Sequence, residues 1–465
     1  MGQPEHADVI VIGLGPGGEY LAGTLAEAGL RVTGIESRLV GGECPYYGCV
    51  PSKMMIRAAN LIAETKRVPG MAGTSAITPD WSPVARRIRE EATDDWNDKV
   101  AADRFTGKGG HLVRGRGRIT GAGQVTVTGA EGTRVFQARK GIVINTGTDP
   151  VIPPLDGLAG TPYWTNREIV QAERVPESLI VLGGGAIGAE LAQVFARFGT
   201  AVTMVEALPQ LVSFEEPEAS ELIERVFANE GITVCAEAPA ETIGYDDRRF
   251  TVHLGQDSYH AERLLVSTGR RTDLTALGVA AVGLDPAATI IPTDGWMRAA
   301  DGVWAIGDVT GKGAFTHMSV YQADIAVRDI LGQGGEPADY RAVPRVTFTD
   351  PEIGSVGLTE KQARAAGLRV RTGVTQIPSS ARGWIHKAGN DGFIKVVEDA
   401  ERSVLVGASS AGPCGGEVLS ALQVAIRAEV PVATLRNMPY AYPTFHRAIE
   451  DALKNLNEVE GFRSS

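Results

Sequence analysis

The sequence has few cysteines, no cluster of basic residues and no long apolar run. Its 465 residues include only 4 cysteines, too few for a secreted domain held together by disulfides. Basic residues form no run, and the formal net charge of −11 argues against nucleic acid or an anionic membrane surface as a partner. No segment approaches the roughly 18 consecutive apolar residues that a membrane-spanning helix requires.

The N-terminal residues also lack the pattern of a signal peptide, because no charged segment is followed by a long apolar stretch. We therefore predict a cytoplasmic protein without a nucleic-acid or membrane partner. In a reducing compartment, a disulfide is more often catalytic than structural.

Length, hydrophobic content and glycine content are, by contrast, high. A chain of 465 residues that is 43% hydrophobic is too long for one ordinary domain, and we expect about two to four. The 57 glycines gather at turns rather than in a low-complexity tract.

A stretch of 28 residues occurs twice without a gap. Residues 9–36 read VIVIGLGPGGEYLAGTLAEAGLRVTGIE, and residues 179–206 read LIVLGGGAIGAELAQVFARFGTAVTMVE. The glycines of the two stretches align as Gly13 with Gly183, Gly15 with Gly185, and Gly18 with Gly188.

Each stretch has the parts of a βαβ unit that binds a dinucleotide. A four-residue apolar run predicts a buried parallel strand, and the G-x-G-x-x-G that follows allows a tight turn and close approach of a pyrophosphate. A helix and a second strand come next, and the strand ends in an acid, Glu36 or Glu206. A carboxylate there can hydrogen-bond ribose hydroxyls. We therefore predict two dinucleotide sites rather than two unrelated glycine-rich turns.

The second acid indicates which nicotinamide is used. No arginine or lysine follows Glu206 in Ala-Leu-Pro-Gln, so nothing there accepts the 2′-phosphate of NADP, which a carboxylate repels. We predict NADH, with NADPH less favoured. The alternative is that Glu206 faces solvent and that Arg197, or another distant side chain, selects the nucleotide.

Two of the four cysteines lie in GGECPYYGC, residues 41–49. Three interpretations compete for Cys44 and Cys49: a zinc half-site, two inert core residues, or a redox-active pair. Zinc requires two further ligands, but Cys235 and Cys414 are isolated and no histidine has ligand spacing to a cysteine. We favour the redox pair.

The local sequence supports this choice. Pro45 and Pro51 are expected to interrupt regular helix on either side of Cys49, which helps because residues five apart on an ideal helix are too distant to bridge easily. After Pro51 the sequence predicts a helix, whose N-terminus stabilises a thiolate, and Lys53 adds a cation.

The pair follows the first βαβ unit within a few residues, so its electrons can pass to the cofactor of that unit. A dithiol that exchanges two electrons needs a partner that takes a hydride and reacts with sulfur. A flavin does both, so we assign FAD to the first unit and NADH to the second.

GGECPYYGCVPSK resembles the redox-active signature of the class I pyridine nucleotide-disulfide oxidoreductases, such as dihydrolipoamide dehydrogenase, glutathione reductase and mercuric reductase. INTGTDPVIPP (144–154) and LVSTGRRTDL (265–274) resemble the crossover segments of that family, and VWAIGDV (303–309) its second flavin motif. The region from about 341 to the end resembles its interface domain. The resemblance covers almost the whole chain and says little about the substrate.

The resemblance implies roles for four residues. Cys44 is the interchange thiol that meets the substrate, and Cys49 is the thiol that lies against the flavin. Lys53 lies near flavin N5 and pairs with Glu190, the alternative being that Glu190 is a solvated helix residue. Such a pair lets the lysine stabilise a reduced flavin while the glutamate compensates its charge.

The resemblance also implies two sets of cofactor-binding residues. The expected FAD residues are Gly13, Gly15, Gly18, Glu36, Ser37, Gly42, Lys53, Gly115, Thr146, Gly147, Arg270, Gly307, Asp308 and Thr316, of which Asp308 binds the ribityl chain. The expected NAD residues are Gly183, Gly185, Ile187, Gly188, Glu190, Glu206 and Gly269. No metal site is expected.

The C-terminal segment departs from the family pattern. Disulfide reductases of this family carry His-Pro-Thr there, with a glutamate five residues after the acid/base histidine, which serves the partner subunit. Here Tyr442 precedes Pro-Thr, and the glutamate position holds Arg447. Tyrosine, with a reference pKa of about 10, is a poor base at neutral pH. His446 is a possible substitute, although we favour a packing or surface role for it.

The fold class we predict is α/β, with two Rossmann-like domains and a C-terminal α+β dimerisation domain. We place the FAD domain at 1–150 and 271–340, the NAD(H) domain at 151–270 and the interface domain at 341–465. Within the interface domain we expect strands at 345–350 and 392–399 and helices at 361–366 and 416–428. The resemblance implies a homodimer.

The predicted activity is electron transfer between NADH, FAD, the Cys44–Cys49 disulfide and a small thiol, disulfide or other electron acceptor. Because the dyad is missing, we expect weak activity on lipoamide or glutathione disulfide. Three alternatives stay open: a mercuric-reductase-like reductase of metal ions, a quinone or oxygen reductase in which flavin reacts directly, and a subunit that binds within a larger lipoamide-enzyme complex. Tyr46 and Tyr47, which lie between the thiols, also differ from the usual family sequence.

Overall fold

The structure is a computed structural model that describes residues 3–458, and it divides into two compact units. The first unit comprises the described residues of Met1–Ser52, with Ala85–Val151 and Arg270–Asp339. The second comprises Lys53–Val84, Ile152–Gly269 and the described residues of Tyr340–Ser465. The three-domain division stays a prediction, because the second unit groups the expected nucleotide and interface regions together.

The first unit is built on a sheet whose central strands are parallel. The strands run in the order β16-β17-β6-β1-β2-β3. Their bounds are Arg298–Ala300, Val303–Ala305, Gly132–Ile144, Glu5–Ile12, Val32–Glu36 and His111–Arg114. Strands β4 (Arg116–Gly121) and β5 (Gln124–Gly129) extend β6 as an antiparallel meander. The apolar run of β1 is fully buried, as expected for a parallel strand covered on both faces.

Helix α1 (Pro16–Glu27) follows β1 and packs closely on α10 (Thr316–Leu331). A side chain at Gly17 would collide with Ser319 of α10, so glycine is required for this close approach. The predicted first repeat therefore folds as β1-α1-β2, with β1 and β2 parallel.

The second repeat folds in the same way within the second unit. It consists of β8 (Ser178–Leu182), α7 (Ala186–Arg197) and β9 (Ala201–Val205), and the parallel sheet has the order β10-β9-β8-β14. Strands β10 and β14 are Thr233–Cys235 and Arg263–Val266. The second unit also contains a separate antiparallel sheet, which consists of β11 (Thr242–Tyr245), β12 (Phe250–Leu254) and β13 (Asp257–Ala261).

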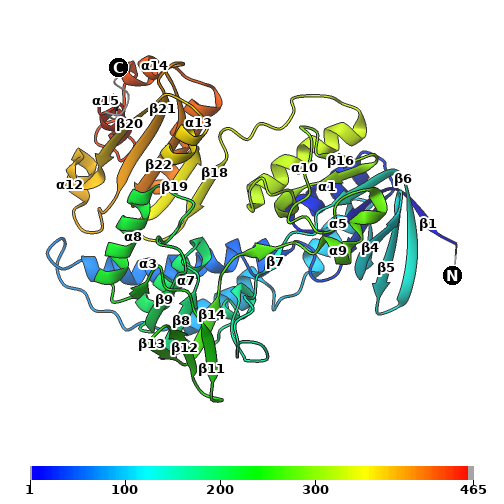
Figure 1. The fold of residues 1–465 in the computed structure, drawn as a ribbon, viewed down its shortest axis with the longest axis horizontal. Coiled ribbons are helices and arrows are strands. Elements are labelled where there is room, and N and C mark those ends of the chain that lie inside the picture. Colours follow the sequence, from blue (N-terminus) through cyan, green and yellow to red (C-terminus); the bar gives the residue numbers. More distant parts are fainter. Residues whose placement is uncertain (1–2, 459–465) are drawn as a thin grey trace. The chain divides into compact units, whose positions relative to one another are not determined.

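The C-terminal part of the second unit is a six-stranded antiparallel sheet in the order β18-β19-β22-β21-β20-β23 (Figure 1). Its strands are Pro344–Thr347, Glu352–Gly357, Val404–Gly412, Phe393–Asp399, Val370–Gln376 and Asn457–Glu458. Helices α13 (Gly415–Arg427) and α15 (Ala448–Lys454) pack against the sheet around one apolar core. The strands and helices expected here are present, with α11 at Glu360–Ala365.

One local expectation is wrong. Helix α3 runs from Cys49 to Arg67, so Pro51 lies in its first turn and does not interrupt it, and Pro45 likewise lies within the short helix α2 (Glu43–Tyr46). Proline is tolerated there because the first N–H groups of a helix have no partner within the helix. Among residues 3–458, we find no helix with the length and apolar character to cross a membrane.

Candidate redox and dinucleotide-binding site

The glycine loop after β1 shows which glycines are structural and which leave room for a ligand. Gly13 has a φ of +92°, and a Cβ there would strike the carbonyl oxygen of Asn145. A Cβ at Gly18 would strike the carbonyl oxygen of Gly13. A Cβ at Gly15, however, would have only Asn145 Nδ2 within 4 Å, at 3.4 Å. The N-terminus of α1 is therefore left open for an anion such as a pyrophosphate.

The second loop repeats this arrangement. Side chains at Gly183 and Gly188 would collide with the Ser267 carbonyl and the Gly183 carbonyl, whereas a Cβ at Gly185 meets nothing within 4 Å. The residues present therefore fit a dinucleotide at each loop.

The acids that end the two repeats hold the loops in place. Glu36 is buried, and its Oε2 accepts the backbone N–H of Leu14 at 2.8 Å while its Oε1 accepts that of Arg38 at 2.7 Å. Burial raises the pKa of Glu36, and these backbone donors oppose the rise.

Glu206 makes the corresponding bonds in the second repeat. Its Oε2 accepts from Gly184 N at 2.6 Å and its Oε1 from Leu208 N at 2.8 Å. The acid therefore fixes the glycine loop, and its contact with a ribose stays a prediction. Arg197, considered above as another nucleotide-selecting residue, has a side chain only 4% exposed and is engaged by Glu230 and Asp350.

The two cysteines lie at the start of helices. Cys44 belongs to the short helix α2 (Glu43–Tyr46), and Cys49 is the first residue of α3. Cys49 Sγ is 3.8 Å from the hydroxyl of Thr316, the first residue of α10. The structure describes both cysteines as thiols, with Cys44 half-buried and Cys49 exposed.

Hydrogen bonding between the two thiols, followed by burial, raises the pKa of Cys44, and the Thr316 hydroxyl partly opposes the rise. Cys44 therefore tends to keep its proton and share it with the Cys49 sulfur. The N-terminus of α10 favours a thiolate beside Thr316.

The loop that carries Cys44 packs on the first glycine loop. Gly42 has a φ of +69°, and a Cβ there would lie 2.8 Å from the Cα of Gly15. Gly41 N donates to the carbonyl of Leu14 at 2.7 Å. Residues 41–44 and the predicted pyrophosphate site are therefore neighbours within the first unit.

Lys53 and Glu190 form an ion pair in the second unit. Lys53 Nζ is 2.8 Å from Glu190 Oε2, and Glu190 Oε1 accepts the backbone N–H of Phe348 at 2.8 Å. Lys53 Nζ also lies 4.6 Å from the centre of the Phe348 ring. The side chain of Glu190 is 6% exposed, so the alternative of a solvated helix residue is wrong.

The expected second flavin motif is linked to the crossover segments. Asp308 Oδ2 accepts from the Thr148 hydroxyl at 2.9 Å, and Arg270 donates to that hydroxyl at 2.7 Å and to the Thr148 carbonyl at 2.6 Å. Gly307 has a φ of +79°, and its N–H donates to Gln322 Oε1 at 2.7 Å.

The remaining expected cofactor residues lie at loops or strand ends. Gly115 N donates to the carbonyl of Glu36 at 3.0 Å, so this glycine lies beside the end of β2. Ser37 directly follows β2, and Ile187 is an exposed residue in the first turn of α7. Thr146 and Gly147 follow β6, and Gly269 precedes Arg270.

Sequence reasoning missed a buried polar group around Asn145. Asn145 Nδ2 donates to the Gly13 carbonyl at 3.2 Å, and Asn145 Oδ1 accepts from the Ser319 hydroxyl at 3.3 Å. An asparagine directly after the buried strand β6 is the signal that could have revealed it, because a buried amide needs partners.

In the C-terminal segment, Tyr442 and Arg447 stand at the positions where the resemblance expects a histidine and a glutamate. Tyr442 is 70% exposed, and the guanidinium of Arg447 lies 5.5 Å from the centre of its ring. Arg447 also pairs with Glu450 at 3.1 Å. The ring of His446 packs edge-on against Tyr440, and its buried Nε2 has no hydrogen-bond partner among the described residues.

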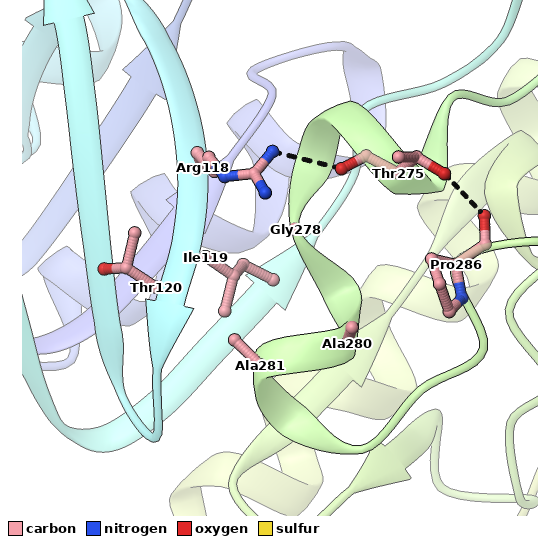
Figure 2. Close-up of a pocket in the computed structure, with 8 residues that line it drawn as sticks. All are labelled: Arg118, Ile119, Thr120, Thr275, Gly278, Ala280, Ala281 and Pro286. Atoms are coloured by element: carbon pink, nitrogen blue, oxygen red, sulfur yellow. Dashed lines mark hydrogen bonds between the residues drawn. The ribbon is translucent and has the colours of Figure 1, made fainter.

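A separate cavity of about 380 Å³ lies in the first unit between β4 and the segment of α9 (Leu274–Leu277) and η2 (Val279–Val282) (Figure 2). Arg118 lines it and donates to the carbonyl of Thr275 at 3.1 Å. None of the predicted site residues lines this cavity.

Two dinucleotide-type loops and a neighbouring pair of thiols define a flavin-dependent oxidoreductase that uses a pyridine nucleotide. Models of the pyridine nucleotide-disulphide oxidoreductase family and of its dimerisation domain match residues 7–324 and 343–453. The chain belongs to this family, whose members use FAD and NAD(P)H.

Relatives named for two different activities align with nearly the whole chain. A dihydrolipoyl dehydrogenase of Chlorobaculum tepidum is 34% identical over 96% of this chain and 96% of its own length. A mercuric reductase of Shewanella putrefaciens is 31% identical over 98% of this chain and 82% of its own length.

Solved structures give the same picture. The Cu(II) complex of the HOCl-induced flavoprotein disulfide reductase RclA from Escherichia coli has a TM-score of 0.85 and 26% identity, and the match covers 98% of this chain and 99% of that one. LpdA from Mycobacterium tuberculosis has a TM-score of 0.84 and 25% identity, with 97% and 99% coverage. The chain is therefore an FAD-dependent NAD(P)H:disulfide oxidoreductase, and the dimerisation-domain match supports a homodimer.

Proposed function

We propose that this enzyme passes electrons from NADH through FAD and the Cys44–Cys49 disulfide to a small acceptor that needs no His-Glu dyad. The observation that carries the proposal is the position of the two thiols, beside Thr316 at the start of α10 and in a loop packed on Gly15. When bound, FAD would supply the two-electron chemistry that links the nicotinamide to the disulfide.

The protein's own groups handle the sulfur chemistry. Reduction breaks the Cys44–Cys49 bond, and two electrons and two protons yield two thiols. The hydrogen bond that raises the pKa of Cys44 holds one of these protons between the sulfurs, and when the other proton leaves, the N-terminus of α10 stabilises the thiolate at Cys49. Once the shared proton moves to the Cys49 sulfur, Cys44 attacks a disulfide substrate as a thiolate, and the two substrate sulfurs take up the two protons and leave as thiols while the Cys44–Cys49 bond forms again.

Lys53 and Glu190 support the flavin in this proposal. The ammonium supplies positive charge for a reduced cofactor, and the buried glutamate keeps that ammonium compensated and oriented. Glu206 selects NADH, because a 2′-phosphate beside it would meet a carboxylate already fixed by two backbone bonds.

The missing dyad indicates which acceptors are poor. A dithiol substrate needs a group that titrates near neutral pH to move its proton. Tyr442 is a poor base at neutral pH, and the His446 ring is packed against Tyr440, which supports weak turnover of lipoamide and glutathione disulfide.

A soft metal ion is the second candidate acceptor. The mercuric reductases among the relatives and the Cu(II) complex of RclA among the similar structures favour it. A metal ion has no proton to exchange, so its reduction does not require the dyad.

The test is an acceptor screen with NADH and NADPH in parallel, comparing wild type with Cys44→Ser. Acceptors should include lipoamide, glutathione disulfide, Hg(II), Cu(II) and a quinone. We expect NADH oxidation that requires Cys44 and is slow with lipoamide. Fast lipoamide turnover that is lost in the Tyr442→Phe/His446→Ala double variant would contradict the acceptor assignment. Full activity in Cys44→Ser would show that flavin reacts directly.

A further inference from the structure

The turn between η1 (Ile88–Ala92) and α5 (Lys99–Gly107) is strained. Asp94, Asp95 and Trp96 have φ values of +48°, +55° and +55°. Residues other than glycine rarely adopt this left-handed conformation, and three in succession are unusual. Backbone strain of this kind persists only where the surroundings enforce it, and it concentrates at functional sites.

Hydrogen bonds from the preceding segment enforce this turn. The hydroxyl of Thr93, which is 1% exposed, donates to the Ile88 carbonyl at 3.0 Å and accepts the N–H of Trp96 at 3.3 Å. Asp95 N donates to the Arg89 carbonyl at 2.7 Å. The conformation of the turn is therefore fixed from within the first unit.

The turn contacts the chain between the two thiols. Trp96 Nε1 donates to the carbonyl oxygen of Tyr46 at 3.2 Å. Tyr46 is the last residue of α2, so no backbone N–H of a later turn of that helix donates to its carbonyl oxygen. This bond therefore fixes the backbone two residues after Cys44 and three residues before Cys49.

The same turn also fixes the chain before Cys44. Asp98 Oδ2 accepts the N–H of Val40 at 2.6 Å, and Asp98 is itself held by Arg114 through two bonds of 2.6 and 2.9 Å. Paired bonds between guanidinium and carboxylate are strong and directional. Val40 directly precedes the Gly41–Gly42 pair, so both sides of Cys44 are anchored to residues 96–98.

We propose that Trp96 and Asp98 are positioning residues that hold the Cys44–Cys49 loop in its dithiol geometry and so set its thiol/disulfide potential. The proposal rests on the proposed function, in which these cysteines cycle between thiol and disulfide. Disulfides form only within a narrow range of Cα separations, so a small shift of the Tyr46 carbonyl changes the balance between the two states.

The test measures that balance directly in the holoenzyme. Wild type and Trp96→Phe are equilibrated with reduced and oxidised dithiothreitol, so that forming the protein disulfide reduces one molecule of oxidised reagent. Thiols are then trapped by alkylation and counted by mass. We expect the Trp96–Tyr46 bond to be kept in the dithiol state and lost when the disulfide forms, so its removal should disfavour the dithiol state about fivefold, which corresponds to a potential about 20 mV more negative.

Trp81→Phe is the matched control. Trp81 is buried whereas Trp96 is half-buried, but the Trp81 indole likewise donates to a backbone carbonyl, that of Ala172, at 2.7 Å, and Trp81 belongs to the second unit. We expect no shift of the thiol/disulfide potential in this variant. A second variant, Asp98→Asn, should shift the potential in the same direction as Trp96→Phe and decides the question if Trp96→Phe does not fold.

The outcomes separate this proposal from the proposed function. If wild type forms the disulfide but Trp96→Phe and Asp98→Asn titrate like Trp81→Phe, the positioning role is wrong and the proposed function stands. If wild type forms no Cys44–Cys49 disulfide at any ratio of reagent, the proposed function itself is wrong, and the positioning role with it.

Discussion

Replacing Arg197 with methionine should remove a structural connection in the second unit. The Arg197 side chain is 4% exposed and donates to Glu230 at 2.6 and 3.0 Å, to Asp350 at 2.8 Å and to Asn60 at 2.7 Å. It therefore joins α7 to α3 and to the segment after β18. Gln193, on the same face of α7, exchanges two bonds of 2.8 Å with the backbone of Asp350.

The expected cost follows from what remains after the change. Removing one partner of a buried ion pair costs about 3–5 kcal/mol, because a buried charge is left uncompensated. Here Asp350 keeps Arg67 at 2.7 Å, and Glu230 keeps Gln193 at 3.1 Å. We therefore expect the lower end of that range, about 3 kcal/mol.

Hydrogen exchange of peptides from α3 and α7 is the suitable assay, because a chain of this size is not expected to unfold in one step. A loss of about 3 kcal/mol lowers protection roughly 100-fold. Arg225→Met is the matched control, since Arg225 and Asp391 form an exposed pair at 3.3 Å, expected to contribute less than about 1 kcal/mol. Equal losses of protection in the two variants would refute the reasoning.

Three further predictions concern other parts of the molecule. Burial lowers the pKa of Lys395, but the hydrogen bonds and charges of Glu218 and Glu216 outweigh burial and raise this pKa from 10.5 to about 12. The stability that these ion pairs contribute is complete below pH 10.5 and is lost towards pH 12. The urea midpoint should therefore fall over that pH range in wild type and fall less in Lys395→Met. Gly42→Ala should lose FAD on gel filtration, because its Cβ would strike Gly15, whereas Gly70→Ala, which has positive φ but open space, should keep it. Tyr442→Phe should change turnover of the preferred acceptor less than about twofold, since the exposed hydroxyl is a poor base at neutral pH; a tenfold loss would assign it a catalytic role.

The repeated unit could be predicted from sequence because its chemistry depends on spacing alone. The apolar strand, the glycine triplet and the final acid occur at fixed intervals. Both copies fold as β-α-β, and in each the acid accepts a hydrogen bond from a backbone N–H of the glycine loop. The family match confirms the fold class and the cofactors. The roles of the individual site residues stay predictions.

Other features leave no such signal. The left-handed turn at 94–96 contains no glycine, so its sequence gives no sign of positive φ. The bonds from Arg197 to Asn60 and Asp350 join residues more than 130 positions apart, and neither pattern nor propensity reports such pairs. The start of α3 was misplaced because proline suppresses helix in the interior but not in the first turn.

The most direct test of the central claim is an anaerobic titration of the purified flavoprotein with NADH, followed by absorbance. We predict that two-electron reduction produces a long-wavelength band from a Cys49 thiolate beside oxidised FAD, and that Cys49→Ser abolishes it. A band of unchanged intensity in Cys49→Ser, or a purified protein that binds no FAD, would contradict the account.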